Sequence, residues 1–331
     1  MRFRNSHALP IAALFLGLMN PAFALLADST YLFQYTLPMH MARALPVSGP
    51  EAAPLNPARL AQAPHWYSEI GRSAAGHVAA FHTGVGATVG YGIRVGMSGF
   101  SVSGTPAGTN AVFLEQRDAV QAAWELPRKA TGPGFSLGYA LIWHSVNAFG
   151  AYKASGVTHD LGLTWRTATR ESEWGFDLGL ALRDLDPIVA RIPEGNGNGR
   201  RYQLYGPNAE ATSHIESPGG VFSAWGSLLA ESGVGPSRYG PFEFSGSGVG
   251  GSDFQLCFDR YGIGVRPLKV LSLRVENLGY DVWQTGATLG AGGLIPFRLE
   301  ADAALSHGYY YAYTRPSGTG WTLALALRSG W

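Results

Sequence analysis

The sequence predicts an all-β protein: a transmembrane antiparallel meander β-barrel of about 14 strands, preceded by a plug-like N-terminal segment without strands. Three features of the chain support this prediction. Large apolar residues alternate with glycine or charged residues over most of the chain beyond His65. An export-type leader precedes that region. The connections between the expected strands also alternate between short and long, as they do in bacterial outer-membrane barrels.

Residues 1–24 have the organisation of a signal peptide. Arg2 and Arg4 give the chain a basic start, and an apolar core follows from Ala8 to Leu18. Ala22-Phe23-Ala24 provides small residues for cleavage. The alternative is an uncleaved anchor helix, but the apolar run is shorter than the roughly 20 residues that a membrane span needs. We therefore expect export through the inner membrane and residence in the outer membrane of a Gram-negative bacterium.

Composition excludes several classes of function. The formal net charge is +1, which argues against a nucleic-acid partner, since that would require a basic surface. Cys257 is the one cysteine, so neither a disulfide framework nor a cysteine-rich metal site can form within the chain. We expect no cofactor.

Residues 25–63 form a second region, either a plug or a periplasmic segment. They are rich in proline and alanine and lack the alternation of a strand. Aromatic and aliphatic residues are frequent between Tyr31 and Met39, whereas a disordered tail is normally polar. We therefore expect the part from Tyr31 to Leu60 to fold into the mouth of the barrel, with Asn56-Pro57-Ala58 as its turn.

Three short motifs resemble those of a known family. Asn56-Pro57-Ala58 is followed by Leu60-Ala61, just ahead of the first expected strand. The sequence D-L-G-L occurs at Asp160–Leu163, and L-G-L-A-L-R-D-L occurs at Leu178–Leu185. These motifs resemble FadL-like fatty-acid transporters and PorV/PorQ-type outer-membrane proteins. The resemblance implies an outer-membrane barrel that carries small hydrophobic molecules or serves a secretion apparatus. One departure is that A-R-A-L-P-V-S-G-P replaces the glycine-rich segment that those families place before the turn.

The stretch from Gly156 to Arg183 shows the barrel pattern best. Each of its two arms has one face of large apolar residues and one face of glycine and charged residues. Because side chains alternate between the faces of a strand, the apolar face meets lipid and the other face lines the lumen.

The same alternation predicts the barrel region, residues 64–331. The expected strands are 64–73, 76–83, 86–104, 117–127, 135–147, 156–166, 173–183, 221–231, 238–246, 252–266, 270–278, 283–291, 297–306 and 320–331. The count is fourteen, with twelve and sixteen as alternatives. With both termini periplasmic, the connections near 84–86, 128–134, 167–173, 232–237, 267–269 and 292–296 are periplasmic and short. The long stretch 184–220 then lies outside.

The last expected strand ends the chain on an aromatic residue. Trp321, Leu323, Leu325 and Leu327 share the apolar face with the final residue, Trp331. A terminal aromatic on an alternating strand resembles the signal that the outer-membrane assembly machinery reads. We expect that machinery and the outer-membrane lipid to be partners of the chain.

The opposite faces of the strands assign charged residues to the lumen, because a charge that faces lipid near the midplane is costly. The expected lumen-facing residues are Arg94, Glu125, His144, Asp160, Arg166, Asp177, Arg183, Arg274, Glu276, Arg298, Glu300 and Asp302. Acidic and basic residues are balanced. Balance favours ion pairs within the lumen over a strongly ion-selective pore.

The sequence offers no catalytic or metal site. His144-Ser145 is the one tempting pair, but adjacent strand residues face opposite sides, so they cannot act as base and nucleophile. The remaining histidines lack metal-ligand spacing. We therefore expect a protein that is not an enzyme.

Three functions compete. The first is transport of small hydrophobic molecules, and the second is a non-transporting barrel that serves a secretion or surface-attachment apparatus. The third is an autotransporter-type translocation domain, but residues 25–63 are too few to be a passenger. A lumen with an aromatic-lined pocket favours the first, and a lumen filled by loops favours the second.

Overall fold

The computed structural model describes residues 52–62, 66–75, 78–90, 92–104, 113–127, 132–148, 152–167, 173–186, 188–192, 200–205, 208–232, 244–247, 253–277, 283–291, 297–309 and 317–329. The expected signal peptide, the part of the N-terminal segment before residue 52, and Trp331 lie outside these residues.

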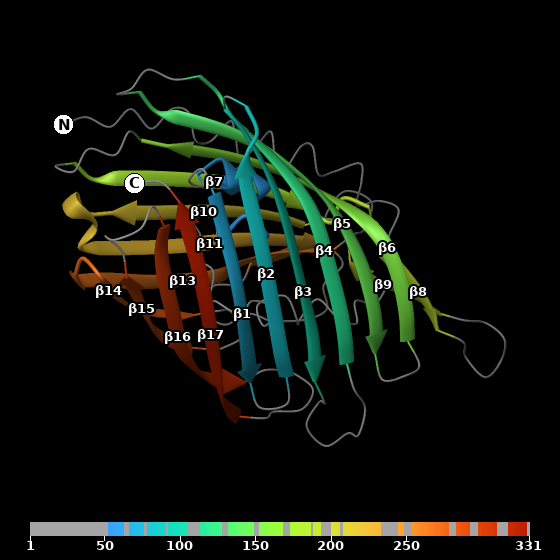
Figure 1. Cartoon of the computed structure of the whole chain (residues 1–331). Coiled ribbons are helices and arrows are strands. Elements are labelled where there is room, and N and C mark those ends of the chain that lie inside the picture. Colours follow the sequence, from blue (N-terminus) through green and yellow to red (C-terminus); the bar gives the residue numbers. More distant parts are fainter. Residues whose placement is uncertain are drawn as a thin grey trace.

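One antiparallel sheet closes on itself as a barrel (Figure 1). Its first seven strands are β1 (Trp66–Ala75), β2 (Val78–Thr88), β3 (Ile93–Gly104), β4 (Phe113–Glu125), β5 (Gly134–Ala148), β6 (Tyr152–Arg166) and β7 (Gly175–Arg183). The ring continues through β10 (Asn208–Glu216), β11 (Phe222–Ser232), β13 (Asp253–Leu268), β14 (Leu271–Asn277), β15 (Trp283–Ala291), β16 (Phe297–Tyr309) and β17 (Ser317–Ser329). The pairing of β1 with β17 closes the ring, which has fourteen strands.

Five described elements lie outside the ring. β12 (Phe244–Ser247) pairs only with β13, and β8 (Ile188–Ile192) and β9 (Arg200–Tyr205) form a separate hairpin that packs against β6 through β8. The two 3₁₀ helices are η3 (Pro57–Gln62) and η4 (Pro218–Gly220). Within the described residues, no helix is long and apolar enough to cross a bilayer.

The two faces of the ring differ in chemistry. On β7, Phe176 and Leu178 are exposed, whereas Gly175, Asp177 and Gly179 are buried. The same pattern recurs around the ring, where exposed leucine, valine and tryptophan side chains alternate with small or charged buried ones. Outward apolar and inward polar residues are the arrangement of a barrel in lipid. The predicted fold class, a meander barrel of about 14 strands with a short non-strand segment before it, is confirmed.

One predicted strand is not in the ring and one strand of the ring was not predicted, although the count is right. The stretch 184–220 was expected to be a loop, but it contains β10, a strand of the ring. Its outward positions include Ala211 and Ser213, which are too small and polar to give the apolar alternation of the other strands. The expected strand 238–246 is not part of the ring. The part of it that the structure describes belongs to β12, which pairs with β13 alone. Pro241, just before β12 in the sequence, has no backbone N–H to donate to a ladder.

The first short connection lies later in the chain than predicted. A turn was expected near 84–86, but β2 continues to Thr88 and the chain turns at 89–92. Gly90 and Gly92 have φ values of +70° and +77°, a region that favours glycine. Gly86 is instead an inward position where the barrel wall meets Leu60.

The connections differ in length at the two ends of the barrel. At the end where β1 begins, the short-turn end, the connections are 89–92, 126–133, 167–174, 217–221, 269–270 and 292–296. The other end, the long-loop end, has the two longest connections, 184–207 and 233–252, together with 76–77, 105–112, 149–151, 278–282 and 310–316. The stretch 232–237 was predicted at the short-turn end, but it belongs to the long-loop end, because β10 adds one crossing of the barrel before it.

Candidate transport lumen and its docked N-terminal segment

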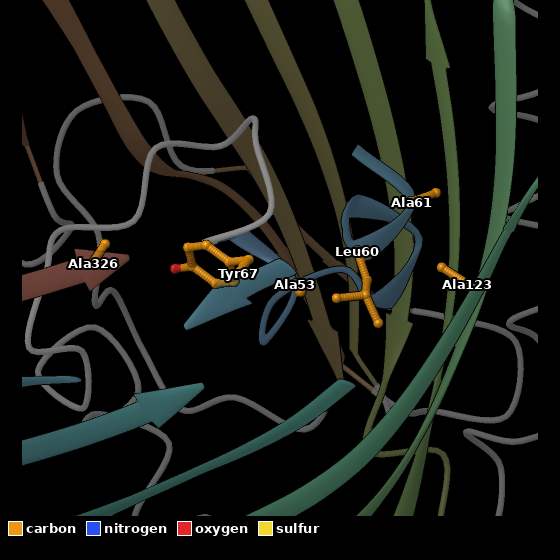
Figure 2. Close-up of a cluster of buried hydrophobic side chains, with 6 residues drawn as sticks. All are labelled: Ala53, Leu60, Ala61, Tyr67, Ala123 and Ala326. Carbon is orange, nitrogen blue, oxygen red and sulfur yellow. The ribbon is translucent and has the colours of Figure 1, made fainter. Parts of the chain in front are cut away.

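Residues 52–62, which we call the docked segment, lie inside the barrel. Leu55, Ala58, Arg59 and Leu60 are buried, and η3 packs against β3, β4, β5 and β6. Leu60 and Ala61 meet Ala123 of β4, and Tyr67 of β1 lies beside Ala53 in the same apolar cluster (Figure 2). Full burial of a leucine side chain contributes roughly 1.5–3 kcal/mol, so this contact favours docking.

Glycines of the barrel wall make room for the docked segment. A Cβ at Gly138 on β5 would lie 2.5 Å from Ala58 Cα and would also overlap the backbone of Pro57. A Cβ at Gly162 on β6 would collide with Asn56. Leu60 fills the space above Gly86 and Gly96, where a Cβ would lie 2.9 and 3.0 Å from its methyl carbons. The inner glycines therefore match the shape of this segment.

Asn56 fastens the turn of the segment to the wall. Its Nδ2 donates to the carbonyl oxygen of Leu163 at 3.3 Å and to that of Leu180 at 3.1 Å. Its Oδ1 accepts from the Ala58 N–H at 3.0 Å, as the side chain at a helix N-cap does. Gln121 of β4 donates to the Ala53 carbonyl at 3.3 Å from the other side. Both ends of the turn are thus tied to strands.

A buried ion pair holds the last turn of the segment. The guanidinium of Arg59, whose side chain is fully buried, binds the carboxylate of Asp177 on β7. Arg59 Nη2 also donates to Thr212 Oγ1 of β10 at 3.0 Å, and Gln62 Nε2 donates to Asp177 Oδ2 at 2.9 Å. A buried charge needs such a partner, because desolvation costs several kcal/mol.

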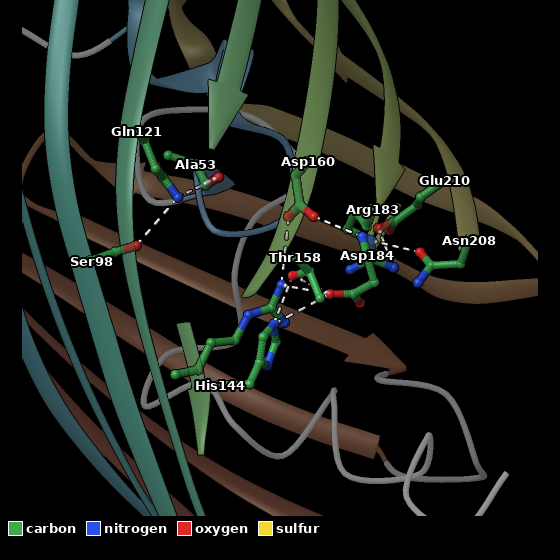
Figure 3. A network of polar contacts seen from close by, with 11 residues as sticks. Ala53, Ser98, Gln121, His144, Thr158, Asp160, Arg183, Asp184, Asn208 and Glu210 are labelled. Carbon is green, nitrogen blue, oxygen red and sulfur yellow. Dashed lines mark hydrogen bonds and ion pairs between the residues drawn. The ribbon is translucent and has the colours of Figure 1, made fainter. Parts of the chain in front are cut away.

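A second polar cluster lies between this segment and the long-loop end (Figure 3). Asp184, which follows β7 with a φ of 51°, donates its N–H to Asp160 Oδ1 at 2.8 Å. Its carboxylate accepts from Thr158 at 3.1 Å and lies 3.5 Å from His144 Nε2 and 3.7 Å from Arg117 Nη2. Arg117 Nη2 is also 3.5 Å from Asp160 Oδ2. These groups form one network that joins β4, β5 and β6 to the residue after β7.

The charges of the neighbouring strands are paired as well. Arg183 Nη2 lies 3.2 Å from Glu210 Oε2, and Arg183 Nε donates to Asn208 Oδ1 at 2.9 Å. Glu125 lies 2.9 Å from Arg166 and also interacts electrostatically with Arg94.

On the opposite wall, Arg274 binds Asp302 through two nitrogens, at 2.5 and 2.8 Å, and Glu276 at 2.8 Å. Arg298 Nε is 3.1 Å from Glu300 Oε1. Each charged lumen candidate named from the sequence thus has at least one polar or charged neighbour, and the twelve residues fall into several separate groups.

Sequence reasoning missed four charged residues of these groups: Arg59, Arg117, Asp184 and Glu210. Arg59 belongs to a segment without strand periodicity, and Asp184 and Glu210 lie in the stretch expected to be a loop. Arg117 opens the expected strand 117–127 and lies directly across from His144, so its inward position could have been found from the alternation.

Among the described residues, His144 and Ser145 lie on opposite faces of β5, so they are not placed as a base and its nucleophile. His144 is buried in the lumen cluster, and Ser145 is exposed on the other face of β5. In the part of the chain that is described, no group of three or more histidine, cysteine and acidic side chains is placed to hold a metal ion. The lumen thus has a polar wall, and the docked segment lies across it.

Solved structures with a similar fold include a monoaromatic hydrocarbon channel, toluene transporters and a Pseudomonas aeruginosa FadL homologue. The chain superposes on the CymD monoaromatic hydrocarbon channel with a TM-score of 0.50, 11% identity, and coverage of 90% of this chain and 99% of that one. The Pseudomonas putida toluene transporter TodX has a TM-score of 0.50 and 11% identity, with coverage of 92% of this chain and 96% of that one. The Ralstonia pickettii toluene transporter TbuX has a TM-score of 0.50 and 13% identity, with coverage of 92% of this chain and 98% of that one. No model of a protein family matches the sequence. No curated protein matches it either. At these identities the likeness establishes the fold.

Gly138→Ala will release the docked segment. The new Cβ would overlap the backbone of Pro57 and Ala58, which cannot give way as a flexible side chain can. Trypsin digestion of the refolded barrel measures the release of the segment, because Arg59 is fully buried, and so protected from cleavage, while the segment is docked. We expect cleavage after Arg59 in G138A and protection in the wild type. Gly290→Ala is the matched control, since its Cβ meets only the end of the Arg298 side chain; equal cleavage of both variants would contradict the fit described above.

Proposed function

We propose that this protein is an outer-membrane transport barrel for small hydrophobic molecules, with residues 25–63 as its plug. The observation that carries the proposal is the docked segment itself. A closed ring with an apolar exterior encloses a segment that is fastened by Asn56 and Arg59, each of which binds groups on the ring. A purely structural barrel has no need of such a segment across its interior.

The similarity in fold supports the same function. The solved structures reported above are described as a monoaromatic hydrocarbon channel and as toluene transporters. The apolar exterior, with Trp124, Trp143, Trp174 and Trp283 exposed on it, suits an outer membrane, where aromatic residues gather at the two interfaces. The proposal includes export of the chain through the expected signal peptide.

Uptake by whole cells tests transport. A Gram-negative host that expresses the chain will take up radiolabelled toluene several-fold faster than the same host with an empty vector. Uptake of a labelled disaccharide serves as the control, because a hydrophobic pathway leaves it unchanged. Equal toluene uptake, with the barrel assembled as shown by its heat-modifiable migration, would reject transport. That outcome would favour the barrel that serves a secretion or surface-attachment apparatus.

A further inference from the structure

The docked segment brings a single charge into the lumen. Arg59 is the one ionisable residue in positions 52–62, and its side chain is fully buried. Its place on the wall, which we call the Arg59 seat, consists of the Asp177 carboxylate, the Thr212 hydroxyl and the bare backbone of Gly179. A Cβ at Gly179 would lie 2.6 Å from Arg59 Nη2. The Arg59 seat is thus shaped to receive a planar cation.

The docked segment itself covers this seat. Arg59 binds one oxygen of the Asp177 carboxylate, and Gln62 Nε2 donates to the other at 2.9 Å. Thr212 Oγ1 accepts from Arg59 Nη2 at 3.0 Å. Both side chains that bind the carboxylate therefore leave with the segment, and its release opens the Arg59 seat to the lumen.

Arg59 also completes the charge balance of the surrounding wall. In the groups described above from β3 to β10, the wall contributes four arginines and five acids besides His144, and Arg59 makes the two signs equal. Arg166, the cross-strand partner of Asp177, already binds Glu125 at 2.9 Å. Release of the segment therefore leaves these groups with one carboxylate in excess, and the carboxylate that loses its guanidinium is that of Asp177.

We propose that Asp177 selects for positively charged molecules once the docked segment is released. The Arg59 seat then holds the ammonium or guanidinium group of a small molecule in the lumen, in the place that Arg59 occupies while the segment is docked. A passage with an excess of one sign of charge concentrates molecules of the opposite sign. The inference rests on the proposed transport function and narrows its substrate class to hydrophobic molecules that carry a cationic group.

Reversal potentials of the full-length chain in planar bilayers test this selectivity. Gly138→Ala opens the lumen and keeps both Arg59 and Asp177, because its clash is with the backbone of Pro57 and Ala58. In a gradient of KCl, we expect G138A to pass K⁺ about threefold more readily than Cl⁻. The double variant G138A/D177N will pass the two ions about equally. With methylguanidinium chloride in place of KCl on one side, the permeability of methylguanidinium relative to K⁺ will also fall from G138A to G138A/D177N.

The matched control is Asp186→Asn in the G138A background. Asp186 is 65% exposed and contacts His159 on the outward side of β6, so this substitution removes a carboxylate from outside the lumen. Its preference for K⁺ will equal that of G138A.

Three results would overturn the inference: no preference for K⁺ in G138A, an undiminished preference in G138A/D177N, or the same loss in G138A/D186N as in G138A/D177N. Any of these, with the conductance of G138A above that of the wild type, would leave the proposed plug and its transport path intact. A conductance of G138A no higher than that of the wild type would overturn the plug and the selectivity together, because the Arg59 seat would then not open.

Discussion

A chain that carries Leu178→Arg will reach the outer membrane in far smaller amounts than the wild type. Leu178 lies near the middle of β7 and is 49% exposed on the apolar side of the ring. An arginine that faces lipid near the midplane costs roughly 2–4 kcal/mol. The quantity of folded, heat-modifiable protein in purified outer membranes measures the effect.

Leu178→Met is the matched control, because it changes shape at the same position without adding a charge, and we expect its yield to be close to that of the wild type. If L178R and L178M assembled equally well, the outward face of β7 would not face lipid. The membrane orientation of the whole ring would then be wrong, since the alternation is continuous from β7 to its neighbours.

Asp177→Asn will release the docked segment from the barrel wall. The substitution keeps the shape of the side chain but leaves the Arg59 guanidinium buried without its carboxylate. Removal of one partner of a buried pair typically costs about 3–5 kcal/mol. We expect trypsin to cleave after Arg59 in this variant, and single-channel conductance in planar bilayers to rise.

A second substitution tests whether the unpaired charge of Arg59 is what undocks the segment in D177N. Arg59→Met in the D177N background removes the stranded charge and keeps a flexible apolar side chain in its place. Because replacement of a buried ion pair by apolar residues is often nearly neutral, we expect the double variant to return to the conductance of the wild type. A conductance as high as that of D177N alone would contradict this explanation, because it would show that the segment needs the ion pair itself and that removal of the stranded charge is not enough.

The alternation of large and small residues was enough to predict the class of fold. It identified the hairpin of β6 and β7, where the outward face is uniformly apolar, and it placed charges such as Asp160 and Asp177 opposite that face. It failed at β10, whose outward residues include Ala211 and Ser213. A strand is recognised by the contrast between its faces, and β10 has little contrast.

The docked segment was harder to predict. The Asn56-Pro57-Ala58 turn was found through the resemblance to a family, but its contacts depend on residues more than 100 positions away, such as Leu163 and Leu180. The glycines that receive it are spread over several strands, and Gly86 was interpreted as part of a turn. No local pattern distinguishes a glycine that makes a turn from a glycine that makes room for another segment.

The central claim is that the N-terminal segment closes a transport path through this barrel, and single-channel conductance of a deletion tests it most directly. The variant lacks residues 27–60 and keeps the signal peptide. We expect it to assemble as a heat-modifiable barrel and to show a higher conductance than the full chain, with D177N in between. An unchanged conductance in a correctly assembled deletion would contradict the account, because the lumen would then be closed by something other than this segment.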